Sequence, residues 1–126
     1  KKKAPPARVP EDAREIAFWN IPVSAGLDFA KLTGDFNPIH WIAPAARAAG
    51  FKNVILHGFA TLARAIEGMN RALFAGDPSR LATIDVRFTR PLVLPAKVGL
   101  YVRGDEIFVG SAKGGPANLV GTFTTR

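Results

Sequence analysis

A chain of 126 residues with 48% hydrophobic residues suits one domain with one core and is too short for two. The absence of cysteine excludes disulfides, thiolate zinc sites and a cysteine nucleophile, so chemistry must come from carboxylates, histidines, hydroxyls or the backbone. The net charge of +7 suits an anionic partner, either nucleic acid or a phosphorylated small molecule, or else a solvated basic surface. The sequence has no zinc-finger pattern, RNA-binding aromatic motif or phosphate-binding loop to favour nucleic acid.

The first residues differ in composition from the rest of the chain. Residues 1–14 carry Pro5, Pro6 and Pro10 among lysines and alanines, a composition that we expect to bury no surface and to form an extended tail or linker. We therefore predict a domain over 15–126, which could be the C-terminal half of a longer tandem chain. The sequence has no bilayer-length apolar run and no signal-peptide core, so we expect a cytoplasmic protein without a membrane partner.

The first half of the predicted domain has one strand followed by short helices. The apolar run 16–21, ended by Pro22, predicts an edge strand. A helix over 25–32 follows, where the Ser24 hydroxyl can accept from the free amides of the first turn. Residues 44–49 then predict one or two helical turns.

The longest helical pattern runs from about His57 to Ala75. Apolar residues recur there at intervals of three and four, which predicts one continuous apolar face. These residues are Phe59, Leu62, Ala63, Ile66, Met69, Leu73 and Phe74. The turn-forming residues 76–78 end this helix.

After Arg80 the period of the apolar residues changes to two, which is typical of strands. The predicted strands include 84–88, 98–102, 106–112 and 118–125, with turns at 104–105 and 113–116. Successive strands without crossover helices cannot form a parallel sheet. The pattern therefore predicts an α+β fold, in which an antiparallel sheet curls around one long central helix.

The stretch "LTGDFNPIHW" predicts an irregular loop that carries two ionisable side chains. Pro38 keeps Asn37 out of the helical conformation, and an Asx turn at Asn37 can hold the loop in one shape. A carboxylate and an imidazole held together in a cleft can orient a water molecule and exchange its proton, so Asp35 and His40 are candidate catalytic residues. The alternative is an ordinary pair of turns in which Asp35 only caps the next helix.

His57 and Gly58 begin the long helix, where the first amides lack helical partners and the helix dipole is positive. The Gly58 amide could stabilise an acyl oxygen that becomes enolate-like, since glycine lets a ligand approach the backbone. In the competing interpretation His57 is a structural histidine with satisfied hydrogen bonds and Gly58 a packing glycine. We favour the structural role for His57 itself.

The segments "FAKLTGDFNPIHW" and "AARAAGFKNVILHGFATLA" closely resemble the MaoC-like dehydratase family, which includes the (R)-specific enoyl-CoA hydratases. The resemblance covers about residues 16–125 and implies the hot-dog fold of that family. The matching residues are Phe29, Leu32, Thr33, Gly34, Asp35, Asn37, Pro38, Ile39, His40, Gly50, Phe51, His57 and Gly58.

The resemblance implies the addition of water to a trans-2-enoyl thioester, or the reverse dehydration of a 3-hydroxyacyl thioester. By that similarity Asp35 and His40 activate the water, Asn37 supports the loop, and the Gly58 amide holds the thioester oxygen. No metal or redox cofactor is implied. Coenzyme A or phosphopantetheine enters only as part of the acyl-CoA or acyl-carrier-protein substrate. The arginines that could meet its phosphates are Arg64, Arg87 and Arg90.

Open sheet edges predict a homodimer. Three other functions remain to be compared with hydration. A thioesterase of the same fold would need an acid on the long helix, where Glu67 is the only one. A non-catalytic acyl-thioester binding module would not need the intact Asp35 and His40. A nucleic-acid binder has only the net charge of +7 in its favour.

Overall fold

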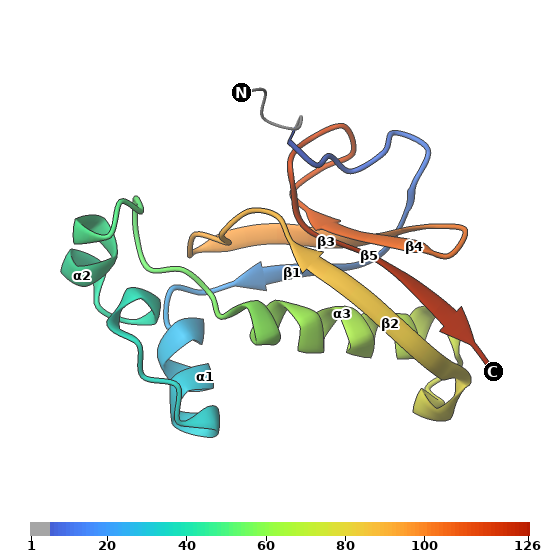
Figure 1. Ribbon diagram of the computed structural model, residues 1–126, viewed down its shortest axis with the longest axis horizontal. Helices are drawn as coiled ribbons and strands as arrows, with labels where there is room; N and C mark the ends of the chain where they lie inside the picture. The colour runs from blue at the N-terminus through green and yellow to red at the C-terminus, as the bar shows by residue number, and fades with distance from the viewer. Residues whose placement is uncertain (1–5) are drawn as a thin grey trace.

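The computed structural model describes residues 6–126, in which a curved antiparallel sheet packs on one long helix (Figure 1). The predicted α+β arrangement is confirmed. In chain order the elements are β1 (Arg14–Ile21), α1 (Ala25–Thr33), the 3-10 turn η1 (Pro38–His40), α2 (Ala43–Ala48), α3 (Gly58–Leu73), the 3-10 turn η2 (Pro78–Arg80), β2 (Leu81–Phe88), β3 (Ala96–Arg103), β4 (Glu106–Gly110) and β5 (Ala117–Thr125).

The sheet has the strand order β1-β3-β4-β5-β2, and every neighbouring pair is antiparallel. Strands β3, β4 and β5 follow one another through short turns, which explains why consecutive strands pair. For example, Tyr101 of β3 lies opposite Phe108 of β4, and Phe108 lies opposite Val120 of β5. Strands β3, β4 and β5 are thus flanked on both sides, while β1 and β2 form the edges.

Helix α3 approaches the sheet closely because the face that it buries is lined mainly by small residues. Ala60, Ala65, Gly68 and Met69 are buried. A Cβ atom added at Gly68 would lie only 2.9 Å from the Leu100 side chain of β3, so a larger residue there would have to displace that side chain. The predicted apolar face was wrong at two positions, since Phe59 is 73% exposed and Ala63 is also exposed. Close packing therefore favours small residues over the large apolar ones that the periodicity selects.

Residues 7–13, which we call the strap, lie against the outer face of the sheet, opposite α3. Val9 and Ala13 are fully buried there with Tyr101, Phe108 and Ala117. The expectation that residues 1–14 bury no surface is therefore wrong for the strap, because its two apolar residues find partners on the sheet.

Backbone hydrogen bonds fix the strap in place. The Ala117 amide donates to the Ala7 carbonyl at 2.9 Å, and the Gly114 amide donates to the Val9 carbonyl at 2.7 Å. Asp12 and Arg103 add an ion pair at 3.0 Å. The strap therefore closes over β3 and β4, whose residues are buried on both faces. Residues 1–5 of the predicted tail lie outside the described residues, and the membership of a tandem chain stays a prediction.

Helix α1 ends as predicted, with Gly34 in the left-handed conformation at φ 80°. The predicted capping bond of Ser24 is wrong, because this residue adopts a helical conformation and its side chain makes no capping hydrogen bond.

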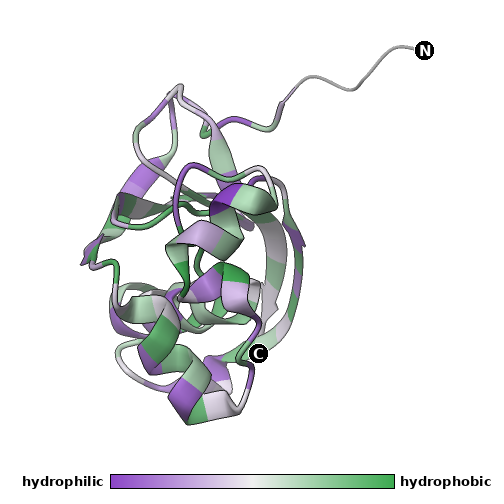
Figure 2. Cartoon of the chain, turned by 90° about the vertical axis from the view of Figure 1, so that its left-hand side faces the viewer, coloured by the Kyte–Doolittle hydropathy of each residue, from purple (hydrophilic) through white to green (hydrophobic). Residues whose placement is uncertain are grey.

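Hydrophilic and hydrophobic residues alternate along the helices at the end of the molecule where α1 and α2 lie (Figure 2). Among residues 6–126, no helix combines the length and apolarity that crossing a membrane requires.

Candidate active site

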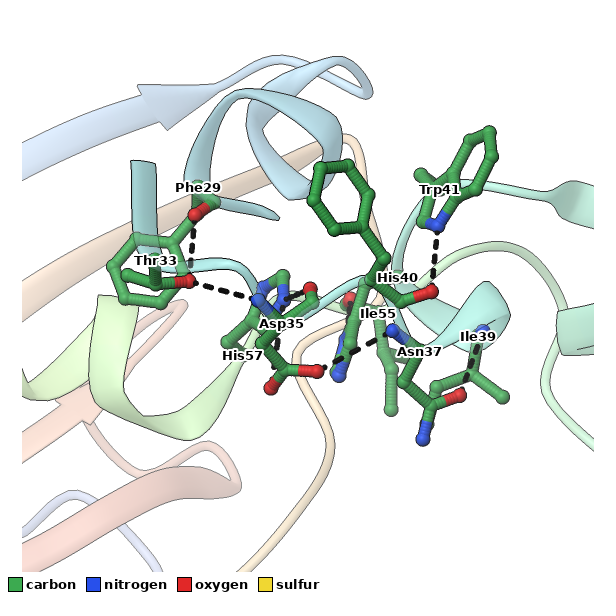
Figure 3. A network of polar contacts seen from close by, with 10 residues as sticks. Phe29, Thr33, Asp35, Asn37, Ile39, His40, Trp41, Ile55 and His57 are labelled. Carbon is green, nitrogen blue, oxygen red and sulfur yellow. Dashed lines mark hydrogen bonds and ion pairs between the residues drawn. The ribbon is translucent and has the colours of Figure 1, made fainter. Parts of the chain in front are cut away.

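The loop between α1 and α2 is held by a chain of short-range hydrogen bonds (Figure 3). The Asp35 carboxylate accepts from the Asn37 amide at 3.3 Å, and the Asn37 side-chain oxygen accepts from the Ile39 amide at 3.2 Å. Asn37 has a non-helical backbone, with φ −52° and ψ 123°, and Pro38 begins η1. The predicted Asx turn is confirmed. It fixes the path of the backbone between Asp35 and His40.

His40 is buried, with 8% exposure, and its ring has one defined partner. Its Nδ1 lies 2.7 Å from the Ile55 carbonyl oxygen. Because a carbonyl can only accept, the proton belongs on Nδ1, and Nε2 keeps a lone pair that can take a proton from water. Gly26 of α1 packs directly on the backbone, since an added Cβ would overlap the His40 carbonyl oxygen. Both the ring and the backbone of His40 are therefore constrained.

His57 contacts both Asp35 and the ring of His40. Its Nε2 is 3.0 Å from the Asp35 carbonyl oxygen and 3.8 Å from the carboxylate Oδ2. Its ring stacks on that of His40, with centroids 3.6 Å apart and planes at 21°. One atom from each of Asp35, His40 and His57 falls within a span of 4.8 Å. The two proposed catalytic groups and His57 thus form one cluster, drawn in Figure 3.

A cavity of about 290 Å³ opens beside this cluster at the start of α3. His40, Gly58 and Thr61 line it on the helix side. Its other lining residues are Ile55, Leu56, Phe88, Thr89, Arg90, Pro91, Leu92 and Asn118. The Asp35 side chain lies outside this lining, and 56% of it is exposed in the single chain. Only the histidine of the pair lines the cavity.

Gly58 lines the cavity, but the lack of a side chain there leaves room for the Phe88 ring and not for a ligand. A Cβ atom at this position would lie 3.1 Å from the ring of Phe88. This contact supports the packing interpretation of the glycine. The Gly58 amide keeps the property on which the oxyanion prediction depends, because it belongs to the first residue of α3 and has no acceptor within the helix.

The three arginines predicted to meet phosphate lie in different places. Arg90 lines the cavity. Arg64 donates to the Ala60 carbonyl at 3.3 Å and lies near Phe29 on the α1 side, while Arg87 lines a groove on the outer face of the sheet. They do not form one phosphate site in this chain, and the contact of each with substrate stays a prediction.

The acid required by the thioesterase alternative points away from the cavity. Glu67 is 65% exposed and pairs with Arg71 at 3.0 Å, one turn further along α3. A surface pair of this kind leaves the carboxylate in water, where it cannot polarise a bound thioester.

Asp35, His40 and His57 are also the residues that could hold a metal ion. Ligand nitrogens must aim their lone pairs at one point. The stacked rings of His40 and His57 instead carry their lone pairs in nearly parallel planes, and one nitrogen of each ring is bonded to a carbonyl. The arrangement therefore fits a metal poorly and suits proton transfer.

One residue of the site, Asn118, has no signal in the sequence. Asn118 of β5 lines the cavity, and its side-chain amide donates to the Pro91 carbonyl at 3.2 Å, which holds the loop before β3. Thr61 lines the helix side with 6% exposure. Only the folded sheet brings Asn118 to the loop, whereas the place of Thr61 near the start of the long helix already suggests a position beside the pocket.

Solved structures define the class to which this architecture belongs. Over 98% of its length the chain superposes with a TM-score of 0.72, at 30% identity, on 48% of the chain of HtdX from Mycobacterium tuberculosis. The (R)-hydratase from A. caviae, at 22% identity, shares the fold with a TM-score of 0.63 over 89% of this chain and 96% of its own. The sheet and central helix are thus a hot-dog fold, as predicted. The sequence model of the MaoC like domain matches residues 7–110, and the chain belongs to this MaoC-like dehydratase family.

Curated relatives carry names that describe related reactions. The 3-hydroxyacyl-thioester dehydratase X of Mycobacterium tuberculosis is 38% identical over 100 residues, which cover 79% of this chain and 34% of the relative. The peroxisomal enoyl-CoA hydratase 2 of Arabidopsis thaliana is 43% identical over 58 residues, which cover 46% of this chain and 19% of the relative. This chain therefore spans about a third or less of the length of these two relatives.

Proposed function

We propose that this chain catalyses the reversible hydration of trans-2-enoyl thioesters to (R)-3-hydroxyacyl thioesters. The observation that carries the proposal is the free Nε2 of His40, which borders a cavity at the start of α3 and lies in one cluster with the Asp35 carboxylate. The names of the dehydratase and hydratase relatives support the same reaction. The (R) configuration depends on this similarity alone.

In the proposed reaction, water lies between Asp35 and His40. The carboxylate accepts a hydrogen bond from one O–H group, and His40 Nε2 takes the proton of the other. The hydroxyl oxygen bonds to C3 of the enoyl group, and the electron pair of the double bond moves toward the thioester oxygen. The Gly58 amide donates to this developing enolate. The proton held by His40 then passes to C2, which restores the neutral imidazole.

We further propose that the reaction needs no metal or redox cofactor and that the acyl group is carried by coenzyme A or a carrier protein. The poor fit of the two stacked imidazoles to a metal supports the first point. Arg90 is the best placed of the three arginines for a phosphate of the carrier, because it borders the cavity. The cytoplasmic location stays a prediction.

We also infer that the chain forms a homodimer. Strand β2 is an edge, and Phe59 and Phe88 beside the cavity are 73% and 50% exposed. The Asp35 carboxylate is also half exposed, so a second copy that covered this end would enclose it. Gel filtration with light scattering at micromolar concentration should give twice the chain mass. A monomer alone would contradict the inference.

The hydration assay follows the loss of absorbance of the conjugated thioester when crotonyl-CoA is added to the pure protein. Asp35→Asn and His40→Ala should each lower kcat by about a hundredfold or more, since each removes a proton-handling group. Circular dichroism should show that both variants stay folded. If the folded variants kept full turnover, Asp35 and His40 would not be the catalytic pair. No turnover of crotonyl-CoA or longer enoyl thioesters by the unchanged protein would contradict the proposed function.

A further inference from the structure

The hydrogen bond and ring stacking of His57 have no part in the proposed proton transfers. We propose that His57 is a positioning residue, whose neutral ring with its proton on Nε2 holds the Asp35 backbone and the His40 ring at a fixed separation. This inference rests on the proposed function, because it assigns His57 a task in that reaction. It differs from a structural role for a buried histidine, which would require only that the space be filled.

The position of the proton follows from the partners of the two ring nitrogens. Nε2 lies 3.0 Å from the Asp35 carbonyl oxygen, which can only accept, so Nε2 must carry the proton. Nδ1 is buried and finds no hydrogen-bond partner within residues 6–126. A second proton there would create a buried donor without an acceptor, which is more costly than an unused lone pair. The contact of 3.8 Å with the Asp35 carboxylate is therefore not an ion pair in the resting site.

His57 joins three parts of the chain through its ring and its backbone. Its Nε2 holds the loop after α1 through Asp35, and its face stacks on His40. Its own carbonyl accepts from the Ala60 amide at 3.0 Å, which ties the residue to the first turn of α3. The Phe29 ring of α1 lies 4.8 Å away between centroids and restricts the imidazole further. Movement of His57 would therefore change the separation of the two catalytic groups.

The neutral state also matters for the chemistry. When His40 takes the proton of water it becomes an imidazolium, 3.6 Å from the ring of His57. A charge on His57 at that distance would oppose the transfer by Coulomb repulsion. Because Nε2 of His57 donates to a carbonyl and not to a carboxylate, His57 stays uncharged while its ring contacts the imidazolium of His40.

Two substitutions separate positioning from space filling. His57→Gln keeps an N–H group at nearly the same reach, while His57→Phe keeps a buried ring of similar size without the donor. We expect His57→Phe to lower kcat by about tenfold to a hundredfold at nearly unchanged KM, and His57→Gln to restore at least part of this loss. A structural role predicts the reverse order, because phenylalanine fills the space better. A kcat of His57→Phe within twofold of the unchanged protein would overturn the proposal.

Asn70 provides a matched control. Its side-chain oxygen is also buried and has no partner within the described part of the chain, but it lies about 20 Å further along α3. Asn70→Ala should change the stability of the protein and leave kcat unchanged. If Asn70→Ala lowered kcat as much as His57→Phe, the effect would be a general one of α3, and the proposal would fail.

A second measurement does not depend on turnover. Nitrogen-15 NMR of the labelled protein distinguishes the protonated from the unprotonated ring nitrogen of each histidine. We expect the proton of His57 on Nε2 and that of His40 on Nδ1. A proton on Nδ1 of His57 would overturn the proposal even in an active enzyme. The expected tautomer in a protein that hydrates no thioester would instead contradict the proposed function alone.

Discussion

Gly26→Ala tests whether the backbone of His40 is held by direct contact with α1. An alanine Cβ at position 26 would overlap the His40 carbonyl oxygen and lie 2.9 Å from its carbonyl carbon. The obstruction is backbone on both sides, so no side chain can rotate away from it. Helix α1 and η1 must therefore separate by about an ångström or more.

The expected size of the effect follows from this displacement. Misplacement of a catalytic group by about 1 Å costs on the order of a hundredfold in rate, so kcat with crotonyl-CoA should fall by about that factor. Overpacking of a buried contact costs about 1–3 kcal/mol, so urea denaturation should show a corresponding loss in the free energy of unfolding.

Gly68→Ala is the matched control, because it makes the same substitution in a buried helical glycine. Its new Cβ would meet the end of the Leu100 side chain at 2.9 Å, and that side chain can rotate. Gly68 lies ten residues, about 15 Å, after the start of α3 and so away from the loop. The substitution should cost some stability and leave kcat within twofold. Full activity and full stability of Gly26→Ala would refute the reasoning, as would an equal loss of kcat in both variants.

Three further predictions concern the loop and the outer face of the sheet. Asn37→Ala removes the acceptor for the Ile39 amide, so kcat should fall by about tenfold with little change in the denaturation midpoint, measured on the same samples. Val9→Ala deletes fully buried methyl groups, so the free energy of unfolding in urea should fall by about 1–2 kcal/mol, whereas an unchanged midpoint would mean that the strap contributes nothing. Burial and the nearby Glu15 carboxylate raise the pKa of Tyr101, so an unfolded chain loses this proton at lower pH than the folded protein does. Stability should therefore decline as pH rises above about 10, and Tyr101→Phe should decline less over that window.

The sheet and the long helix could be predicted because their signals are local. Ile84, Val86 and Phe88 alternate with polar residues, and that period places them on a strand whatever the strand pairs with. The strap could not be predicted in the same way. Val9 and Ala13 are buried by Tyr101 and Phe108, which lie about ninety residues further along the chain, and the composition of the segment gives no sign of this contact.

The candidate site also has a part that is local in the sequence and a part that depends on tertiary packing. The bonds from Asp35 to Asn37 and from Asn37 to Ile39 each span two residues, so both partners of each turn can be recognised within one short segment of the sequence. The contacts of His57 could not be predicted in this way, because they join it to Asp35, 22 residues earlier, and to the ring of His40. Such contacts depend on how α1 and α3 pack, which no pattern within either helix encodes.

The strap also bears on the order in which the molecule can fold. Its hydrogen bonds join Ala7 to Ala117 and Val9 to Gly114, so they close chain loops of more than a hundred residues. Contacts of such high order form late and slow the search for the native topology. On a ribosome, β3 and β4 would emerge with one apolar face uncovered until β5 and its preceding turn had been synthesised. During that interval Tyr101 and Phe108 would stay uncovered, and transiently exposed apolar surface of this kind favours aggregation.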